Sequence, residues 1–307
     1  MVKHPTRDTY ARLAQAAIPG GRLVRAWPLD GGFSARVTVM EISGPDGARH
    51  KLVVRQYGDG DREAATRMVR NEYRLLEILT AQKLAVPGPV YLDAPGEFLT
   101  EPGMVMEFVE GDTDFAPHDL PAYLGQMADH LCRIHKLDCA SHDFSFLPSV
   151  SGHVARLIAA RGGKAVAETL PYLDDILVVL ETAWPPAQNN PDALLHGDYW
   201  PGNVICQDGR ITGIIDWEGA KTGDPLADLA VSRTEVLWAF GRDARAQFTD
   251  HYVRGAKLDL AALPYWDLYT ALRHVHAFAG WAAGHPNEKS MRDGLRYLVD
   301  QALRQVQ

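Results

Sequence analysis

The segment that most constrains this chain is 193–230, which reads ALLHGDYWPGNVICQDGRITGIIDWEGAKTGDPLADLA. Two apolar runs, 204–206 and 211–215, flank the pair Asp208-Gly209. Asp-Gly between two such runs predicts a tight β-hairpin, because both residues tolerate the positive φ angles of its turn. The chain is therefore expected to fold back on itself here, with polar residues at both ends of the hairpin.

These polar residues carry a recognisable chemistry. His196, Asp198 and Asn203 precede the first strand of the predicted hairpin, and Asp216 follows the second. Carboxylate and amide oxygens are hard ligands, which suit Mg²⁺ better than zinc. In a kinase catalytic loop an Asp accepts the proton of the substrate hydroxyl, an Asn five residues later holds a metal ion, and a second metal-binding Asp follows. Asp198, Asn203 and Asp216 have this spacing.

The segment resembles the aminoglycoside phosphotransferase and choline kinase family, small-molecule kinases with a protein-kinase-like fold. The family loop His-Gly-Asp-x-x-x-x-Asn is matched by 196–203, its Ile-Asp-Trp/Phe-Glu/Asp segment by 215–218, and its Gly-Asp-Pro-x-x-Asp-Leu segment by 223–229. The resemblance implies a two-lobed α+β fold. Residues 1–109 would form a small β-rich nucleotide-binding lobe, and 110–307 a larger, mostly helical lobe for catalysis and acceptor binding.

The resemblance also implies the role of each residue in the loop. Asp198 and His196 are the predicted catalytic residues: Asp198 would be the base, and His196 would brace the catalytic loop through hydrogen bonds, with proton transfer as its alternative role. Asn203 and Asp216 would bind Mg²⁺, with ATP or GTP as the phosphoryl donor. Glu218 would be a secondary group near the metal.

A predicted helix over 7–17 precedes three β-like runs, 22–29, 34–42 and 50–57. Between the first two runs lies Asp30-Gly31-Gly32-Phe33-Ser34. Glycines allow backbone N–H groups to approach phosphates, because no side chain intervenes. Gly31, Gly32 and Ser34 are accordingly predicted to cover the nucleotide phosphates, and a simple turn between strands is the alternative.

Arg55 ends the third predicted strand, where protein kinases have a lysine that holds the α and β phosphates. Arginine is always charged and can bind phosphate oxygens in a bidentate fork, so the role is chemically possible. Lys51 shares a face of the strand with Arg55 and is a rival. A solvated cation at a strand end is the other interpretation of Arg55.

An amphipathic helix over 61–83 follows, with its apolar stripe at Met68, Leu75, Leu76 and Leu79. Glu72, in the middle of this helix, is the predicted partner of Arg55. Glu63 and Glu77 are rivals for this pairing. The apolar run 104–109 then leads to a predicted hinge, where Glu107 and Val109 are assigned to nucleotide binding.

Helices are predicted near 119–138, 152–161 and 170–183 before the hairpin, and at 225–240, 242–255, 264–283 and 288–304 after it. Asp224 is expected to cap the helix that follows Pro225, which is a structural role. From residue 257 onward, six Lys and Arg stand against five Asp and Glu, which gives no support for a dedicated polycation site. The acidic region 107–143 leaves open an attraction for cationic substrates.

Composition limits the class of protein. A net charge of −8 argues against a nucleic-acid partner, which requires a basic face. No run reaches the 18–20 apolar residues, roughly, of a membrane span, and residues 1–10 lack the apolar segment of a signal peptide. The three cysteines are too scattered for a disulfide or zinc framework, so we expect a cytoplasmic protein without a membrane partner.

The predicted function is therefore Mg²⁺-dependent transfer of the γ-phosphoryl group of ATP or GTP to a small-molecule hydroxyl. The acceptor class stays open among aminoglycoside-like, macrolide-like, sugar-like and amino-alcohol-like compounds. Two alternatives remain. One is a metal-dependent hydrolase with His196, Asp198 and Asp216 as ligands. The other is a catalytically silent nucleotide-binding module, suggested by Arg55 in place of lysine.

Overall fold

The computed structural model describes residues 5–29, 35–57, 61–160, 172–187, 189–278 and 287–306. The chain divides into two compact units. The N-terminal unit contains Met1–Gly111 and the later segment Thr212–Glu218, and the C-terminal unit contains Asp112–Ile211 and Gly219–Gln307. The lobe boundary at 109/110 stays a prediction. The division into units adds a point that the sequence did not indicate, namely that Asp216 belongs to the same unit as Arg55 and Glu72.

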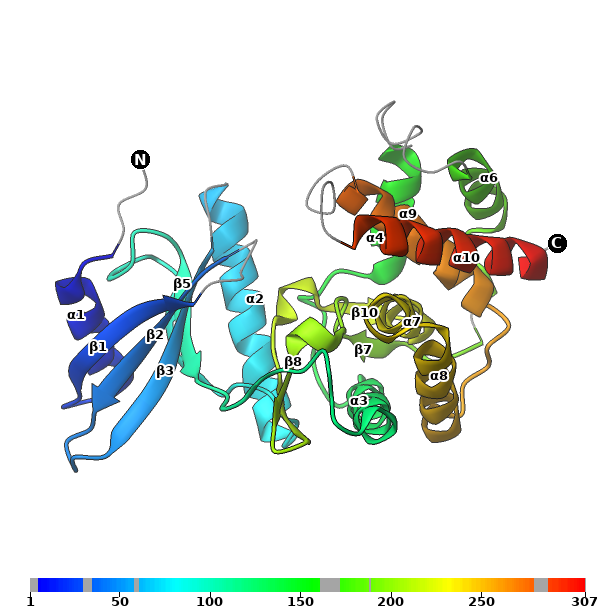
Figure 1. The fold of residues 1–307 in the computed structure, drawn as a ribbon. Helices are drawn as coiled ribbons and strands as arrows, with labels where there is room; N and C mark the ends of the chain where they lie inside the picture. Colours follow the sequence, from blue (N-terminus) through cyan, green and yellow to red (C-terminus); the bar gives the residue numbers. More distant parts are fainter. Residues whose placement is uncertain are drawn as a thin grey trace. The chain divides into compact units, whose positions relative to one another are not determined.

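The N-terminal unit is built on an antiparallel five-stranded sheet with strand order β1-β2-β3-β5-β4. The strands are β1 (Arg22–Leu29), β2 (Ala35–Ser43), β3 (Arg49–Tyr57), β4 (Pro89–Asp93) and β5 (Gly103–Glu107). Helix α1 (Arg7–Ala17) covers one face of the sheet and α2 (Arg62–Ala81) the other, as Figure 1 shows. Neighbouring side chains of a strand point to opposite faces. Val54 accordingly joins the core beneath α1, while Arg55 points towards α2.

Helix α2 begins at the carboxylate of Asp61, which accepts a hydrogen bond from the Glu63 backbone N–H. Its buried stripe follows helical spacing at Ala65, Val69, Glu72, Leu76 and Leu79, with Leu75 also buried. The prediction that Met68 belongs to this stripe is wrong. Met68 is 41% exposed because it stands at the edge of the stripe, and Val69 takes the core position.

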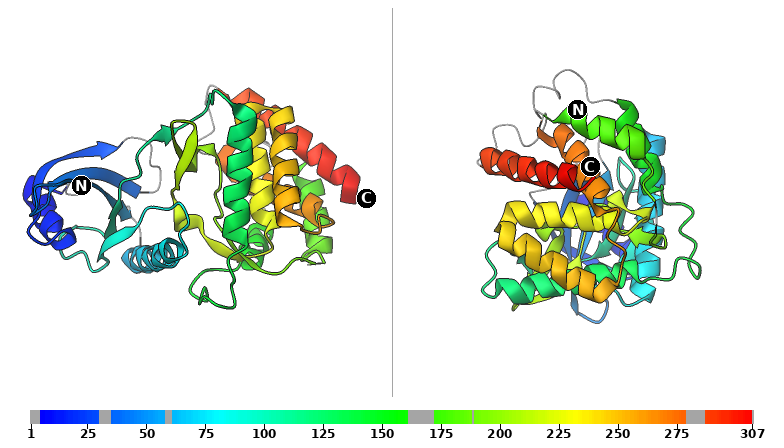
Figure 2. Two further views of the ribbon diagram at one scale, coloured as in Figure 1. Left: turned by 90° about the horizontal axis from the view of Figure 1, so that it is seen from below. Right: turned by 90° about the vertical axis from the view of Figure 1, so that its right-hand side faces the viewer.

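The C-terminal unit is mostly helical. Its helices are α3 (Leu120–His135), α4 (Val150–Ala160), α6 (Leu173–Ala183), α7 (Leu226–Phe240), α8 (Arg242–Ala256), α9 (Leu263–Phe278) and α10 (Glu288–Val306). Figure 2 shows α3, α7 and α8 side by side. Leucines and small apolar residues of α6, α9 and α10 form one continuous buried cluster. The predicted α+β fold, with strands concentrated in the N-terminal part and helices in the C-terminal part, is confirmed.

The central segment, 193–223, contains short β-strands. Strand β7 (Ala193–Leu195) pairs with β10 (Lys221–Gly223), and β6 (Asp112–Thr113) pairs with β8 (Val204–Gln207). Strand β8 is joined to β9 (Arg210–Ile214) by the predicted tight turn, in which Asp208 has φ 51° and Gly209 has φ 74°. The hairpin prediction is confirmed, and the polar residues stand at its ends as expected.

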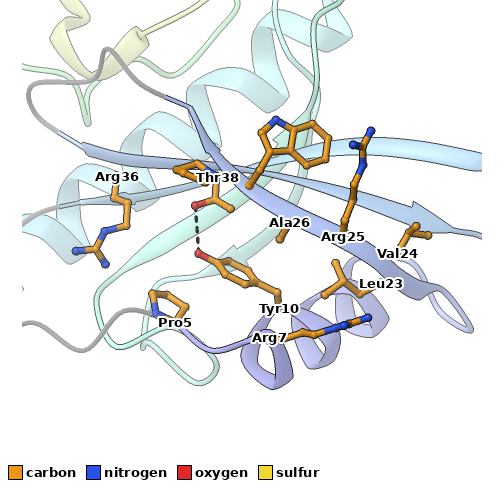
Figure 3. Close-up of a pocket in the computed structure, with 11 residues that line it drawn as sticks. Pro5, Arg7, Tyr10, Leu23, Val24, Arg25, Ala26, Arg36 and Thr38 are labelled. Atoms are coloured by element: carbon orange, nitrogen blue, oxygen red, sulfur yellow. Dashed lines mark hydrogen bonds between the residues drawn. The ribbon is translucent and has the colours of Figure 1, made fainter.

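A cavity of about 540 Å³ lies beside β1 in the N-terminal unit, and Figure 3 shows its lining. The Tyr10 hydroxyl and the Thr38 hydroxyl share a hydrogen bond of 3.1 Å on its inner wall. Among the predicted site residues that the structure describes, none lines this cavity. Within the described ranges, no helix is both long enough and apolar enough to cross a bilayer.

Candidate functional site

The predicted phosphate-covering residues Gly31, Gly32 and Ser34 lie outside the described residues, so this part of the nucleotide site stays a prediction. The other predicted site residues are described. They fall into two groups, one in each unit, and we treat each group by itself.

Arg55 is the centre of the group in the N-terminal unit. It is 6% exposed, and one guanidinium nitrogen lies 3.5 Å from Oε1 of Glu72. The other, Nη2, lies 2.5 Å from Oδ1 of Asp216 and 2.7 Å from Oε2 of Glu218. The predicted pairing of Arg55 with Glu72 is present, and the interpretation of Arg55 as a solvated cation is wrong.

The rivals of this pair are engaged elsewhere. The Lys51 ammonium forms an exposed ion pair of 2.8 Å with Glu110. Glu63 is exposed and lies 3.9 Å from Arg67, and Glu77 is exposed on the solvent side of α2. Burial therefore selects Arg55 and Glu72 from the candidates that the sequence left open.

Three carboxylates around one guanidinium leave this cluster with excess negative charge. Burial raises the pKa of Glu72 to about 7, because the charges of Asp216 and Glu218 add to the burial and outweigh the opposing effect of Arg55. The pKa of Arg55 is raised despite its burial, because the carboxylates stabilise its charged form. The side chains of Asp216 and Glu218 stay 31% and 24% exposed. Their oxygens are hard, partly accessible donors, which fits a Mg²⁺ ion.

Asp216 is held in an unusual backbone conformation. Its φ is 66°, in the left-handed region that costs a residue with a side chain of the order of 1–2 kcal/mol. The next residue, Trp217, is fully buried and donates from its indole N–H to the Ile214 carbonyl at 3.0 Å. This anchored turn after β9 fixes the direction of the Asp216 carboxylate.

At the predicted hinge, Glu107 ends β5. Its backbone N–H donates to the Gly88 carbonyl at 2.8 Å, and its carboxylate accepts from the Gly88 N–H at 3.2 Å. The Glu107 amide is thus already used within the protein. Val109 lies so close to Gly213 that a Cβ at Gly213 would come within 2.6 Å of it. Nucleotide binding by Glu107 and Val109 stays a prediction.

Asp198 is the centre of the group in the C-terminal unit. Its Oδ2 accepts a hydrogen bond of 3.1 Å from the Asn203 amide nitrogen, which also donates to the Asp198 carbonyl at 2.8 Å. Asn203 is buried and lies in the 3₁₀ turn Pro201–Asn203, which sets this geometry. Because the amide nitrogen faces Asp198, the amide oxygen is the Asn203 atom left for a cation.

His196 is fully buried, and its Nδ1 accepts a hydrogen bond of 3.3 Å from the Asp198 backbone N–H. Its ring meets the ring of Tyr199 edge-on at 5.8 Å. These contacts suit the bracing role that the sequence suggested. Among the described residues, no group of three His, Cys, Asp or Glu side chains is arranged to hold a metal ion.

Asp228 belongs to the same group, and the sequence alone did not indicate a role for it. It is 1% exposed, and it accepts from the backbone N–H groups of His196 at 2.6 Å and Gly197 at 2.8 Å. His135, the last residue of α3, lies 3.2 Å from the same carboxylate. Burial acts to raise the pKa of Asp228, but the hydrogen bond and charge of His135, the charge of His196 and the hydrogen bond from Gly197 outweigh it and hold the pKa below 3.8. Asp228 therefore clamps the backbone of His196 and Gly197 as a carboxylate.

Asp224 has the structural role predicted for it. Its Oδ1 accepts from the Leu226 backbone N–H at 2.9 Å, where α7 begins. The Trp266 indole N–H donates to its other oxygen at 3.3 Å.

The sequence alone also did not indicate a role for Arg273 of α9. Its Nη2 lies 2.5 Å from Oδ1 of Asp198, and its Nη1 donates to the Gly197 carbonyl at 2.6 Å. It stands 75 positions from Asp198 in the sequence, and no motif connects the two. Only the Gly-Asp-Pro-x-x-Asp segment carried a sequence signal for Asp228, and no comparable signal existed for Arg273.

Comparison with known protein families agrees with this geometry. The model of the phosphotransferase enzyme family matches residues 26–290. A homoserine kinase from Chelativorans sp. is 30% identical over 184 residues, which cover 57% of this chain and 54% of that protein. Acyl-CoA dehydrogenase family member 11 from Gallus gallus is 27% identical over 182 residues, which cover 55% of this chain and 23% of that protein. The match thus spans about a quarter of the dehydrogenase relative and about half of the kinase.

Solved structures show the same fold. A crystal structure of a candidate aminoglycoside phosphotransferase from Ralstonia eutropha has a TM-score of 0.72 at 14% identity, covering 99% of this chain and 98% of that one. An aminoglycoside phosphotransferase with bound ADP has a TM-score of 0.62 at 15% identity, with 98% and 99% covered. Another, in complex with GDP and kanamycin, has a TM-score of 0.64 at 16% identity, with 97% and 96% covered.

Proposed function

Because the chain belongs to the phosphotransferase enzyme family, we propose that it transfers the γ-phosphoryl group of ATP or GTP to the hydroxyl of a small molecule in a Mg²⁺-dependent reaction. The observation that carries the proposal is the built catalytic loop, in which Asn203 and Arg273 orient the Asp198 carboxylate and Asp228 clamps the backbone before it. Relatives solved with ADP and with GDP support a nucleoside triphosphate as donor.

Asp198 is the proposed base. Its carboxylate would orient the acceptor hydroxyl and take its proton, an effect worth roughly 10²–10⁴-fold in rate. The two hydrogen bonds that hold its oxygens reduce the reorientation needed before reaction, because the carboxylate is already fixed. His196 positions the Asp198 backbone and takes no part in proton transfer.

Arg55, supported by Glu72, is proposed to bind phosphate oxygens in place of the usual lysine. The residues proposed to hold Mg²⁺ are Asn203 and Asp216, with Glu218 as a further donor. When bound, the ion would supply charge neutralisation for the transferred phosphoryl group. Only Oδ1 of Asp216 contacts the guanidinium, so Oδ2 would be the oxygen left for the ion.

The proposal is tested by thermal unfolding of the protein with ATP, GTP or no nucleotide, each with and without Mg²⁺. A ligand at about 100 times its dissociation constant should stabilise the folded protein by roughly 2.7 kcal/mol. We expect a Mg²⁺-dependent rise in Tm that Asp216→Ala abolishes and that Asp250→Ala, an exposed residue of α8, leaves intact.

Turnover is tested by ADP or GDP release with a panel of hydroxylated acceptors. Asp198→Asn should retain the nucleotide-dependent rise in Tm and lose acceptor-dependent release. Phosphate release that does not depend on an acceptor would favour the hydrolase alternative, and nucleotide binding without turnover on any acceptor would favour the silent module. An unchanged Tm with both nucleotides would overturn the proposal.

A further inference from the structure

Two cations flank the residue that precedes the proposed base. The guanidinium of Arg273 reaches both Gly197 and Asp198, as described above. The ammonium of Lys221, on β10, donates to the Gly219 carbonyl at 2.6 Å. It lies 3.1 Å from the position that a Cβ on Gly197 would occupy. Positive charge is therefore placed next to the catalytic carboxylate from two separate elements, α9 and β10.

Helix α4 contributes to the same region. Ser149, at its start, forms a β-bridge with Thr222 of β10, and the ring of His153 meets the ring of Tyr269 of α9 edge-on at 6.1 Å. Burial lowers the pKa of His153 to about 4, and the charges of Lys221, Arg273 and Arg156 add to the shift. His153 is consequently a neutral hydrogen-bonding group at pH 7, surrounded by cations.

The carboxylates nearby are already used. Asp228 is bound to the catalytic loop and to His135. Oε1 of Glu235 lies 2.9 Å from Nε2 of His274. One oxygen of Asp198 is bound to Arg273. Lys221 makes no ion pair with a carboxylate among the residues that the structure describes. Burial and the charge of Arg273 lower its pKa to about 8, against the opposing charges of Asp228 and Asp198. A largely buried ammonium without a directly paired carboxylate favours an anionic ligand.

Given the proposed function, we infer that the acceptor is an alcohol carrying an anionic oxygen group, a carboxylate or a phosphate, which Lys221 and Arg273 bind beside the hydroxyl that is phosphorylated. Polycationic acceptors are disfavoured, because their ammonium groups would meet these two cations. In the reaction the acceptor oxygen forms a bond to the γ-phosphorus, and the bond from that phosphorus to the β-phosphate oxygen breaks. The hydroxyl proton passes to Asp198, and ADP or GDP leaves.

The first test compares acceptors. ADP or GDP release is measured with hydroxycarboxylates of increasing chain length from glycolate upward, with their amides, with glycerol 3-phosphate and with kanamycin. We expect at least one anionic acceptor to have a kcat/KM ten-fold or more above its neutral analogue, and kanamycin to be a poor acceptor. Turnover of carboxylates alone or of the phosphate alone identifies the anionic group. Preference for amides or kanamycin over every anion would overturn the inference.

The second test uses variants. Lys221→Met should raise KM for the preferred anion about ten-fold and lower the ratio of kcat/KM between that anion and its neutral analogue by a similar factor. Arg254→Met, an exposed cation of α8 without a described ion pair, is the matched control and should change neither. Arg273→Lys should restore part of the anion preference lost in Arg273→Met, because the charge is kept while the two-pronged contact with the Gly197 carbonyl and Asp198 is lost.

Nucleotide binding separates the two possible failures. Suppose that wild type and Lys221→Met show equal Mg²⁺-dependent rises in Tm and the same preference for the anion over its neutral analogue. The phosphotransferase proposal then stands and the anionic acceptor is refuted. If wild type shows no nucleotide-dependent rise, the proposed function itself has failed. Binding of each anionic acceptor without nucleotide is measured separately as a rise in Tm. Lys221→Met should abolish this rise whether or not turnover is observed.

Discussion

Replacing Asp228 by Asn tests the clamp on the catalytic loop with a minimal change in shape. The carboxylate accepts from two backbone N–H groups and contacts His135, and it is 1% exposed. An Asn side chain keeps one acceptor oxygen and presents an amide N–H to a donor. A hydrogen bond to a charged group contributes about 1.5–3 kcal/mol, and a buried donor left without a partner costs about 1–3 kcal/mol. We expect a loss of about 2–4 kcal/mol in the free energy of unfolding.

In a domain of 150–250 residues, 1 kcal/mol corresponds to a change in Tm of roughly 2–4 °C, so the Asp228→Asn variant should melt about 4–16 °C below wild type at pH 7. Asp250→Asn makes the same chemical change at an exposed position of α8 and should shift Tm by less than about 1 °C. Equal Tm values for the two variants would refute the clamp.

The pH dependence of this difference has a definite sign. The folded-state pKa of Asp228 lies below 3.8, so the carboxylate stabilises the folded protein at pH values above its unfolded-state pKa. That stabilisation is lost as the pH falls through the folded-state value. The gap in Tm between wild type and Asp228→Asn should therefore be full at pH 7 and should narrow only below about pH 4.

Two further predictions concern backbone space and a buried carboxyl. Gly197 and Gly209 both have positive φ, 80° and 74°, but a Cβ on Gly197 would collide with the Gly219 carbonyl, whereas Gly209 has open space. Gly209→Ala should cost about 1–2 kcal/mol and Gly197→Ala clearly more, and equal denaturation midpoints would contradict this. For Glu72 the folded-state pKa of about 7 lies above the reference value of 4.5, so its stabilising contribution is complete below pH 4.5 and is lost as the pH rises through 7. In metal-free buffer, Glu72→Gln should gain stability relative to wild type between pH 5 and pH 8, and a difference in Tm independent of pH would show that the carboxyl ionises normally.

Which contacts the sequence could predict depends on how far apart the contacting residues lie along the chain. The hairpin, Asp198 and Asn203 lie within a few residues of one another, so turn chemistry and spacing were sufficient to find them. The pairing of Arg55 with Glu72 was predicted because Glu72 lies in the middle of its helix, at an offset similar to that of the glutamate that pairs with the kinase lysine. Arg273 was not accessible, because its contact with Asp198 depends on how α9 packs in the helical unit.

Met68 shows the same limit on a smaller scale. Periodicity placed it on the apolar stripe of α2, but periodicity gives the direction of a stripe and not its width. Tertiary packing decided that Val69 is buried and Met68 is not. The presence of a helix was predictable from the sequence, whereas the edge of its buried face was not.

The assignment of Thr212–Glu218 to the N-terminal unit has a consequence for how this chain can be cut into fragments. A gene fragment that encodes only residues 1–111 would contain Arg55 and Glu72 but would lack Asp216 and Glu218, two of the three counter-charges of that arginine. Of the three carboxylates described around the guanidinium, only Glu72 would remain, so we expect the fragment to be unstable in expression. Fusing the heptapeptide 212–218 to its end through a flexible linker should rescue its solubility.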